Sequence, residues 1–201
     1  MSWIKVIGFE EATGKLKSIY NKIKGPNNQI DNVLSIHSLR PHTLTGHMSL
    51  YKNALHHSNN TFPNWMLELL GTYTSYINNC EYCYEHHFAG MKRFLNDDKK
   101  ADEIRHHIEN GSLPNYLAEK EYALIDYAHK LTLKAASLSK ADISYLKSLG
   151  YDDGEILEVN QVVAYFNYAN RTVMGLGVNT DGEVLGLSPS NKNDESAWDH
   201  K

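Results

Sequence analysis

The sequence lacks both a long apolar run and a surplus of positive charge. A run of about 18 apolar residues occurs nowhere, and the first 20 residues carry five charged side chains without a stretch typical of a signal peptide. The 20 lysines and arginines are scattered and are outnumbered by 24 aspartates and glutamates, for a formal charge of −4. We therefore expect a soluble, cytoplasmic protein whose partners include neither a membrane nor a nucleic acid.

Cysteine is equally scarce, since Cys80 and Cys83 are the only two. Structural disulfides are rare in a reducing cytosol, and so small a ring restrains little of the unfolded chain. A close pair in such a protein is more often redox-active or metal-binding. Half of a zinc site and two inert core cysteines remain alternatives, although the chain has no second pair to complete four zinc ligands. Covalent haem attachment is excluded because Tyr84, and not a histidine, follows Cys83.

Alternating β-branched runs, which indicate strands, are also few, and a thioredoxin fold is disfavoured because its βαβ context is missing. A chain of 201 residues that is 41% apolar and 22% charged fits one globular domain. We expect a single all-α domain over residues 1–178, with its motif-bearing core at about 37–110. Residues 179–201 are rich in Ser, Asn, Asp and Gly, and we expect an irregular or partly disordered C-terminal arm.

Proline, glycine and asparagine divide the helical periodicity into segments. Asn79 is predicted to be an N-cap, which places Cys80 in the first turn of the helix that follows. The last helix is apolar enough to lie at the centre of a core or at an interface. The predicted helices cover about residues 11–24, 30–39, 41–57, 63–77, 79–95, 99–110, 118–135, 139–150 and 152–174.

The cysteine segment, if helical, gathers three reactive side chains on one face. At about 100° per residue, Cys80 and His87 project within roughly 20° of each other, and Cys83 lies roughly 40–60° away. The helix N-terminus and the imidazole both favour a thiolate. A thiolate that attacks a hydroperoxide becomes a sulfenic acid, which the second cysteine can capture as a disulfide. Helix geometry alone favours Cys80 as the nucleophile, because it lies nearer the helix start.

A wider pattern surrounds this pair. Glu68 stands twelve residues before Cys80, and His87 stands four residues after Cys83. With the run Cys80-Glu81-Tyr82-Cys83, this spacing resembles the signature of AhpD-type alkylhydroperoxidases of the carboxymuconolactone decarboxylase superfamily. Residues 165–171 and 175–177 are similar to the C-terminal segment of the peroxidase-related branch of that family. The resemblance spans roughly residues 37–178.

The resemblance implies an all-helical, AhpD-like protein that assembles into trimers or hexamers and uses neither a metal nor an organic cofactor. Its reduced cysteines would consume a small-molecule hydroperoxide or pass electrons to a peroxiredoxin, with a thiol or dithiol protein as reductant. Carried over by position, Cys83 is peroxidatic and Cys80 is resolving. His87 is then the base, and Glu68 is its acidic partner.

Tyr82 departs from the pattern, because the best-known peroxidases carry a histidine between the cysteines. A phenol with a reference pKa of about 10 is a poor base at neutral pH, so weaker peroxidase activity or another substrate would follow. His86 is an alternative to His87 as the base. On one continuous helix Glu68 would point about 120° away from Cys80, so a break at residues 78–79 must redirect it.

Other polar residues are expected to lie at the surface or to make structural contacts. The histidine doublets at 56–57 and 106–107 fall on polar helix ends and are expected at the surface. A cluster on the last helix is expected to satisfy buried helix ends or subunit contacts rather than to line a pocket: Tyr165, Asn167, Asn170 and Arg171. Two other functions stay open, namely acid–base decarboxylase or lactone chemistry on a small carboxylated substrate, and a non-enzymatic helical oligomer that senses redox state.

Overall fold

The computed structural model describes residues 2–189 and 199. Over these residues the chain forms nine α-helices and no β-strand, so the all-α prediction is confirmed. Most predicted boundaries are correct to within a few residues. The helices are α1 (Gly14–Ile23), α2 (Asn32–Ser35), α3 (Pro41–Leu55), α4 (Asn64–Ile77), α5 (Glu81–Leu95), α6 (Asp98–Glu109), α7 (Glu119–Lys134), α8 (Lys140–Ser148) and α9 (Asp153–Gly175).

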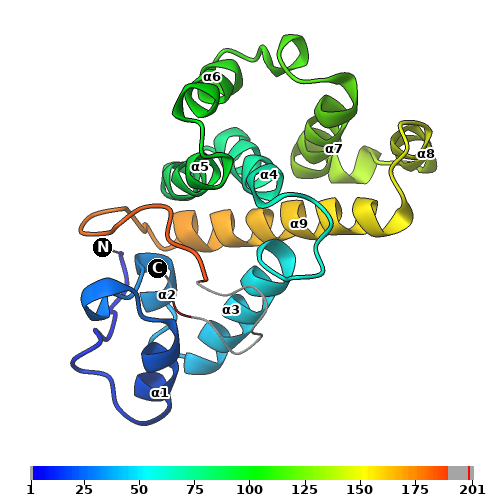
Figure 1. The fold of residues 1–201 in the computed structure, drawn as a ribbon. Helices are drawn as coiled ribbons and strands as arrows, with labels where there is room; N and C mark the ends of the chain where they lie inside the picture. The colour runs from blue at the N-terminus through cyan, green and yellow to red at the C-terminus, as the bar shows by residue number, and fades with distance from the viewer. Residues whose placement is uncertain (1, 190–198, 200–201) are drawn as a thin grey trace.

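The long helix α9 runs through the middle of the molecule, with α4 to α7 on one side of it and α1 to α3 on the other (Figure 1). Helix α4 packs against α5, α7 and α9. Nine of its 14 residues are buried, so it is covered on nearly every side. This helix therefore lies at the centre of the core.

The corner between α4 and α5 decides where the cysteines lie. Asn79 has a left-handed backbone, with φ of 57°, and its N–H donates to the carbonyl of Tyr76 at 2.9 Å. The N–H of Cys80 donates to the carbonyl of Ser75 at 2.9 Å, which completes a Schellman motif. The prediction that Asn79 is the N-cap of the next helix is therefore wrong. Asn79 closes α4, and Cys80 itself takes the N-cap position of α5.

Helices α4 and α9 approach closely at a glycine. A Cβ atom added to Gly71 would lie 2.1 Å from Cζ of Phe166, whose side chain is fully buried. Side chains cannot approach so closely, so only glycine lets this aromatic ring rest on α4. The same ring contacts the candidate site described below.

Replacing Gly71 with alanine is expected to lower the free energy of unfolding by about 1–3 kcal/mol, because the ring and both helices must shift. Gly46→Ala is the matched control, since an added Cβ at this position of α3 meets nothing within 4 Å. That change is expected to raise the free energy of unfolding by about 0.5–1 kcal/mol, because alanine favours a helix. Denaturant unfolding measures the free energy of unfolding of both variants. If both substitutions changed it in the same direction, the close approach of Phe166 to Gly71 would be contradicted.

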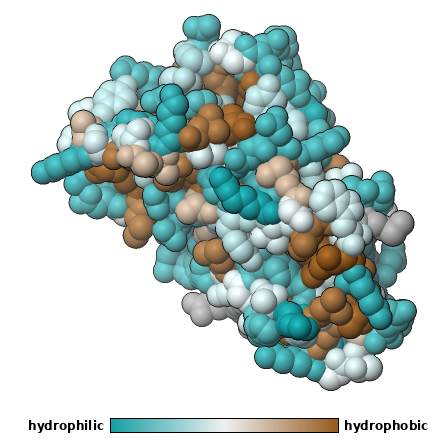
Figure 2. Space-filling view, turned by 180° about the vertical axis from the view of Figure 1, so that it is seen from behind, coloured by the Kyte–Doolittle hydropathy of each residue, from teal (hydrophilic) through white to brown (hydrophobic). Residues whose placement is uncertain are grey.

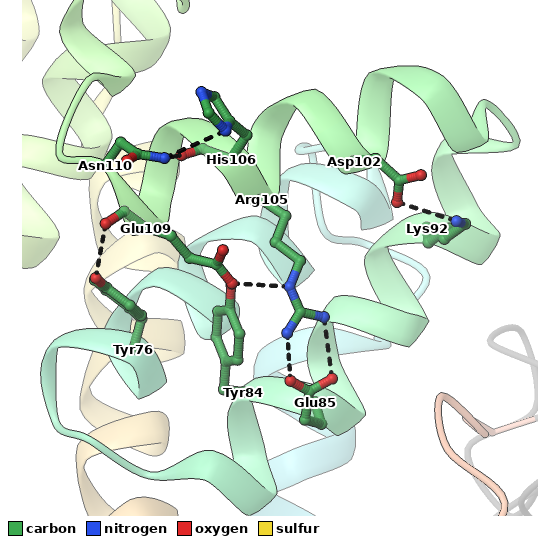
Figure 3. A network of polar contacts seen from close by, with 9 residues as sticks. All are labelled: Tyr76, Tyr84, Glu85, Lys92, Asp102, Arg105, His106, Glu109 and Asn110. Carbon is green, nitrogen blue, oxygen red and sulfur yellow. Dashed lines mark hydrogen bonds and ion pairs between the residues drawn. The ribbon is translucent and has the colours of Figure 1, made fainter.

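A polar network fastens α6 to α5 (Figure 3). The guanidinium of Arg105 donates to the two carboxylate oxygens of Glu85 at 2.6 and 3.1 Å, and its Nε donates to Glu109 at 2.9 Å. The hydroxyl of Tyr84 donates to the same oxygen of Glu109 at 3.0 Å. Bidentate pairs of this kind fix orientation as well as distance. The network therefore holds α5, the helix that follows Cys80 and carries Cys83, in a defined position.

The chain after α9 contains turns but no helix or strand over residues 179–189. These residues belong to the C-terminal arm predicted at 179–201. The rest of that predicted arm, residues 190–198 and 200–201, lies outside the described residues. The described part packs back onto α5, where Arg93 donates to Ser188, and onto the start of α2, where Asn32 donates to Glu183.

Candidate functional site: a cavity shared by Cys83, His87 and Glu68

A small cavity of about 40 Å³ lies among α3, α4, α5, α9 and the chain after α9. Three of the four predicted site residues, Glu68, Cys83 and His87, line it. One water molecule needs about 10–15 Å³ on this measure, so the cavity has room for only a few. The other residues that line it include Asp31, Val33 and Leu34 at α2, and His47, Tyr51, Tyr82, His86, Gly90, Tyr165, Ala169 and Leu187.

Glu68 and His87 form the strongest polar contact of the cavity. Nδ1 of His87 lies 2.7 Å from Oε2 of Glu68, and the glutamate side chain is only 3% exposed. A buried carboxylate accepts hydrogen bonds, so the proton sits on Nδ1 and Nε2 is left as an acceptor. Gly90 makes room for this carboxylate, because an added Cβ would lie 3.2 Å from both Cδ and Oε2 of Glu68.

The imidazole of His87 is also held by packing. Its ring meets the ring of Phe166 edge to face, with centroids 4.4 Å apart and an interplanar angle of 88°. This is the same phenylalanine that rests on Gly71. A hydrogen bond to a carboxylate and an aromatic contact together fix both the tautomer and the orientation of the ring.

The two cysteines are free thiols, 1% and 3% exposed for Cys80 and Cys83. They hydrogen-bond to each other at the start of α5. Cys83 lies one helical turn before His87, on the same face of α5. The side-chain amide of Asn170, from α9, also donates to the sulfur of Cys83.

The two thiols differ in acidity. The hydrogen bond from the Cys83 thiol lowers the pKa of Cys80 below its ordinary value, although burial acts in the opposite direction. Burial raises the pKa of Cys83 well above its ordinary value, and the hydrogen bond with Cys80 adds to that effect. Cys80 is therefore the thiol that ionises first. Cys83 requires a base to take its proton, and His87 is one turn away.

This difference predicts an order of ionisation. In a Cys83→Ser variant the serine hydroxyl can still donate to Cys80, so alkylation of Cys80 is expected to begin at a lower pH than alkylation of Cys83 in Cys80→Ser. The sign follows from the pKa directions, because a thiol reacts only as its thiolate forms. Rates with iodoacetamide between about pH 6 and pH 10 measure both profiles. The reverse order would contradict the assignment.

The two cysteines open toward different spaces. Cys83 borders the cavity that holds His87 and Glu68, whereas Cys80 borders a separate groove of about 270 Å³. Ser75, Tyr76 and Asn79 from the α4–α5 corner line this groove, together with Glu81 and Tyr84 of α5. One thiol of the pair thus borders the cavity that His87 lines, and the other borders a surface groove.

His56 is a polar residue of the site that the sequence did not indicate. The prediction that it lies at the surface is wrong, because it is only 3% exposed, whereas His106 is exposed as expected. Nε2 of His56 lies 2.9 Å from the Tyr51 hydroxyl and 3.8 Å from Oε1 of Glu68. The carboxylate of Glu68 therefore lies between two imidazoles. No sequence pattern distinguishes His56 from its neighbour.

The polar cluster on α9 has both of the roles considered for it. Asn170 is fully buried, accepts from the Asn78 side chain at 2.9 Å and donates to the Ser75 hydroxyl at 3.1 Å, so it satisfies the end of α4. Tyr165 instead lines the cavity, which the sequence treated as the less favoured outcome. Burial raises the pKa of Tyr165 well above its ordinary value, so its hydroxyl stays protonated.

Tyr82, between the cysteines, is held by the chain after α9. Its hydroxyl donates to Oε1 of Glu183 at 2.9 Å, and Oε2 of Glu183 lies 3.4 Å from Nε2 of His86. Burial and the charge of Glu183 hold the pKa of Tyr82 well above its ordinary value. Tyr82 is thus a hydrogen-bond donor and not a base. His86, the alternative to His87, faces Glu183 and not Glu68.

The described residues contain neither a group of metal-binding side chains nor a membrane-spanning helix. Within residues 2–189 and 199, no three histidine, cysteine, aspartate or glutamate side chains are grouped as a metal ion would require. None of the helices in the same ranges is long and apolar enough to cross a membrane.

Comparison with known proteins finds similarity in structure and not in sequence. No protein-family model and no curated protein matches the chain. An uncharacterised peroxidase-related protein from Ralstonia eutropha JMP134, described as an alkylhydroperoxidase AhpD core, aligns with a TM-score of 0.73 and 19% identity over 89% of this chain and 91% of that one. A peroxidase-related protein from Silicibacter sp. TM1040 aligns with a TM-score of 0.67 and 23% identity over 76% and 78% of the two chains.

A third neighbour has a named activity. A variant of the debrominase Bmp8, in complex with 2,3,4-tribromopyrrole, aligns with a TM-score of 0.63 and 15% identity over 84% of each chain. Identities this low show the fold alone. The chain is therefore an all-helical protein with the AhpD-like fold. It shares that fold with peroxidase-related proteins and with one debrominase.

Proposed function

We propose that this protein is a thiol-dependent hydroperoxidase that works through Cys80 and Cys83. One observation carries the proposal: Cys83 and His87 line the same small cavity as Glu68, and His87 is hydrogen-bonded to Glu68 at 2.7 Å. A nucleophile, a base and a group that orients the base are the three parts of an activated thiol. The AhpD-like fold of the peroxidase-related neighbours supports the same reaction class.

The first half of the cycle takes place in the cavity. Nε2 of His87 removes the proton of the Cys83 thiol, and the negative charge of Glu68 stabilises the imidazolium that forms. The Cys83 thiolate attacks the terminal oxygen of the hydroperoxide, and the O–O bond breaks. Cys83 becomes a sulfenic acid, and the departing alkoxide takes the proton from His87 and leaves as an alcohol, or as water when the substrate is hydrogen peroxide.

The second half closes and reopens the disulfide. The Cys80 thiolate, favoured by its lowered pKa, attacks the sulfur of the Cys83 sulfenic acid. An S–S bond forms, and hydroxide leaves as water once protonated. A dithiol reductant then attacks the sulfur of Cys80 from its groove, releases Cys83 as a thiolate and leaves as its own disulfide, so that two electrons restore both thiols.

Three alternative functions would give different experimental results. A debrominase among the fold neighbours makes dehalogenation of a small aromatic ring a second candidate. The cavity of about 40 Å³ disfavours such a ring, because a cavity that binds benzene measures about 150 Å³. Turnover of a cyclic carboxylate by a cysteine-free variant would favour the acid–base alternative. A disulfide that changes assembly while peroxide turnover stays at background would favour a redox sensor.

The decisive experiment is thiol titration before and after one equivalent of hydrogen peroxide, with metal analysis of the same sample. We expect two thiols to be lost per equivalent and regained with dithiothreitol. Steady-state peroxide consumption with dithiothreitol should accompany this. If the double variant Cys80→Ser/Cys83→Ser consumed peroxide at the wild-type rate, the proposed function would be rejected.

A homo-oligomer remains a prediction of the resemblance. Leu157 and Tyr168, three helical turns apart on α9, are 59% and 40% exposed. Hydrophobic patches interrupted by polar residues are also visible on the face in Figure 2. Larger contiguous apolar areas mark subunit contacts, and these two side chains lie on one face of α9, where such a contact can be tested. Sedimentation equilibrium is expected to give the mass of a trimer or hexamer, and Leu157→Asp should lower that mass; a wild-type monomer would contradict the prediction.

A further inference from the structure

Residues 179–188, the first part of the predicted C-terminal arm and the part meant by the arm from this point on, cover one side of the cavity. Figure 1 shows this segment turning back from the end of α9, between α2 and α5. Leu187 of the arm lines the cavity directly, and Glu183 contacts Tyr82 and His86, which also line it. The arm is therefore part of the cavity wall, although it belongs to no helix.

Glu183 anchors the first half of the arm. Its side chain is only 2% exposed. The backbone N–H of Asn32 donates to Oε1 at 2.5 Å, and the hydroxyl of Tyr82 donates to the same oxygen at 2.9 Å. The carbonyl of Asn179 accepts from the Asn32 side chain at 2.9 Å. Because burying a carboxylate is costly unless donors surround it, these contacts hold the arm in one position.

A glycine anchors the second half. Gly186 has a φ of 76°, and an added Cβ would lie 2.8 Å from the carbonyl carbon of Ala89 in α5. Backbone therefore rests directly on backbone here. Arg93 of α5 also donates to the hydroxyl of Ser188. Leu187 lies between these two contacts, so its side chain is fixed at the cavity.

The size of the cavity limits what can reach Cys83. The cavity measures about 40 Å³, whereas an engineered cavity that binds benzene measures about 150 Å³. Hydrogen peroxide, or a hydroperoxide with a very short alkyl group, fits a space that holds a few water molecules. An aryl hydroperoxide does not fit unless the arm moves.

We propose that the C-terminal arm makes this site selective for small hydroperoxides, with Leu187 as the specificity-determining side chain. The proposal rests on the proposed function and adds the substrate class. Leu187 acts by excluding volume and takes no part in the chemistry. The arm contacts of Glu183 and Gly186 keep it in place.

The first test compares hydrogen peroxide with cumene hydroperoxide. The wild-type protein should show kcat/KM at least about tenfold higher for hydrogen peroxide. Leu187→Ala should reduce that ratio by roughly tenfold or more, because the substitution removes side-chain carbons from the cavity wall. Leu185→Ala is the matched control, because this leucine of the same arm is 38% exposed and borders no part of the cavity. If the ratio of kcat/KM for hydrogen peroxide to that for cumene hydroperoxide were equal in all three proteins, the proposal would be overturned.

The second test loosens the arm as a whole. Gly186→Ala introduces a methyl group against Ala89, whereas Gly182→Ala puts one into open space. The two glycines have similar φ values, 76° for Gly186 and 79° for Gly182, so both variants place alanine at a positive φ. Only Gly186→Ala should admit cumene hydroperoxide. If the two variants behaved alike, seating of the arm on α5 would not control access.

A third measurement separates this proposal from the proposed function. In Cys80→Ser proteins, Cys83 is the remaining thiol, and its alkylation rates by iodoacetamide and by the bulkier N-phenylmaleimide can be compared without any peroxide. Leu187→Ala should raise the maleimide rate relative to the iodoacetamide rate, and Leu185→Ala should not. If the protein consumed no hydroperoxide but showed this pattern of alkylation rates, the proposed function would be rejected and the size limit at Cys83 would stand. An unchanged ratio in Leu187→Ala would reject the size limit.

Discussion

Cys83→Ser is expected to abolish hydroperoxide turnover, with the rate falling to the uncatalysed background. Serine keeps the size and hydrogen bonds of the thiol, but its hydroxyl does not attack peroxide oxygen at neutral pH. The expected loss is about 10³-fold or more, since the nucleophile belongs to a unit whose members act together. Stopped-flow consumption of hydrogen peroxide with dithiothreitol measures it.

Cys80→Ser serves as the control that separates the two roles. This variant should still react once with peroxide and then stop at the sulfenic acid of Cys83, which mass spectrometry detects as one added oxygen atom. Cys83→Ser should gain no such oxygen. If the oxygen appeared on Cys80 in Cys83→Ser and was absent from Cys83 in Cys80→Ser, the roles carried over from the resemblance would be reversed. The lowered pKa of Cys80 would then identify the nucleophile.

Glu68→Gln is expected to reduce kcat by about 10²-fold or more, within the range that proton-transfer catalysis supplies. Glutamine fills the same space beside Gly90, but it is neutral and cannot stabilise a protonated His87. It can also donate to Nδ1, which would favour the wrong tautomer of the imidazole. The sulfenic acid should still form in the variant, only more slowly.

Glu158→Gln is a useful comparison for Glu68→Gln. Its carboxylate accepts hydrogen bonds from Thr61 and Phe62 at about 3 Å, far from the cysteines in sequence and outside both cysteine-lined spaces. The same charge change there should leave peroxide turnover within about twofold of wild type. A similar loss of activity in both variants would mean that Glu68 acts through stability, which unfolding of Glu68→Gln would reveal.

Local signals in the sequence predicted much of the helical order. Pro41 and Pro63 mark helix starts, and Ser139, the first residue of the helix predicted at 139–150, caps α8, with its N–H donating to Asp142 at 2.7 Å. These features depend on residues a few positions apart, so the sequence alone displays them. Asn79 shows the limit of such signals. Asparagine favours both helix starts and left-handed helix ends, and only the bonds to Ser75 and Tyr76 decide between them.

The site was predictable only where its parts are close in sequence. The spacing of Glu68, Cys83 and His87 indicated a shared site, and the structure brings these residues to one cavity. Their catalytic roles stay predictions. Glu183 is 101 residues from Tyr82, and no periodicity connects them. The burial of His56 likewise follows from how α3 packs against α4, which a one-dimensional pattern does not contain.

The two sulfurs border different spaces, and this separation has a kinetic consequence. If oxidant arrives at Cys83 and reductant at Cys80, the two need not displace each other from a common entrance. A high concentration of either should then saturate its own half-reaction without competitive inhibition of the other. A bulky reduced donor can then bind at the Cys80 groove while peroxide exchanges in the cavity, and it leaves as its disulfide after each turnover.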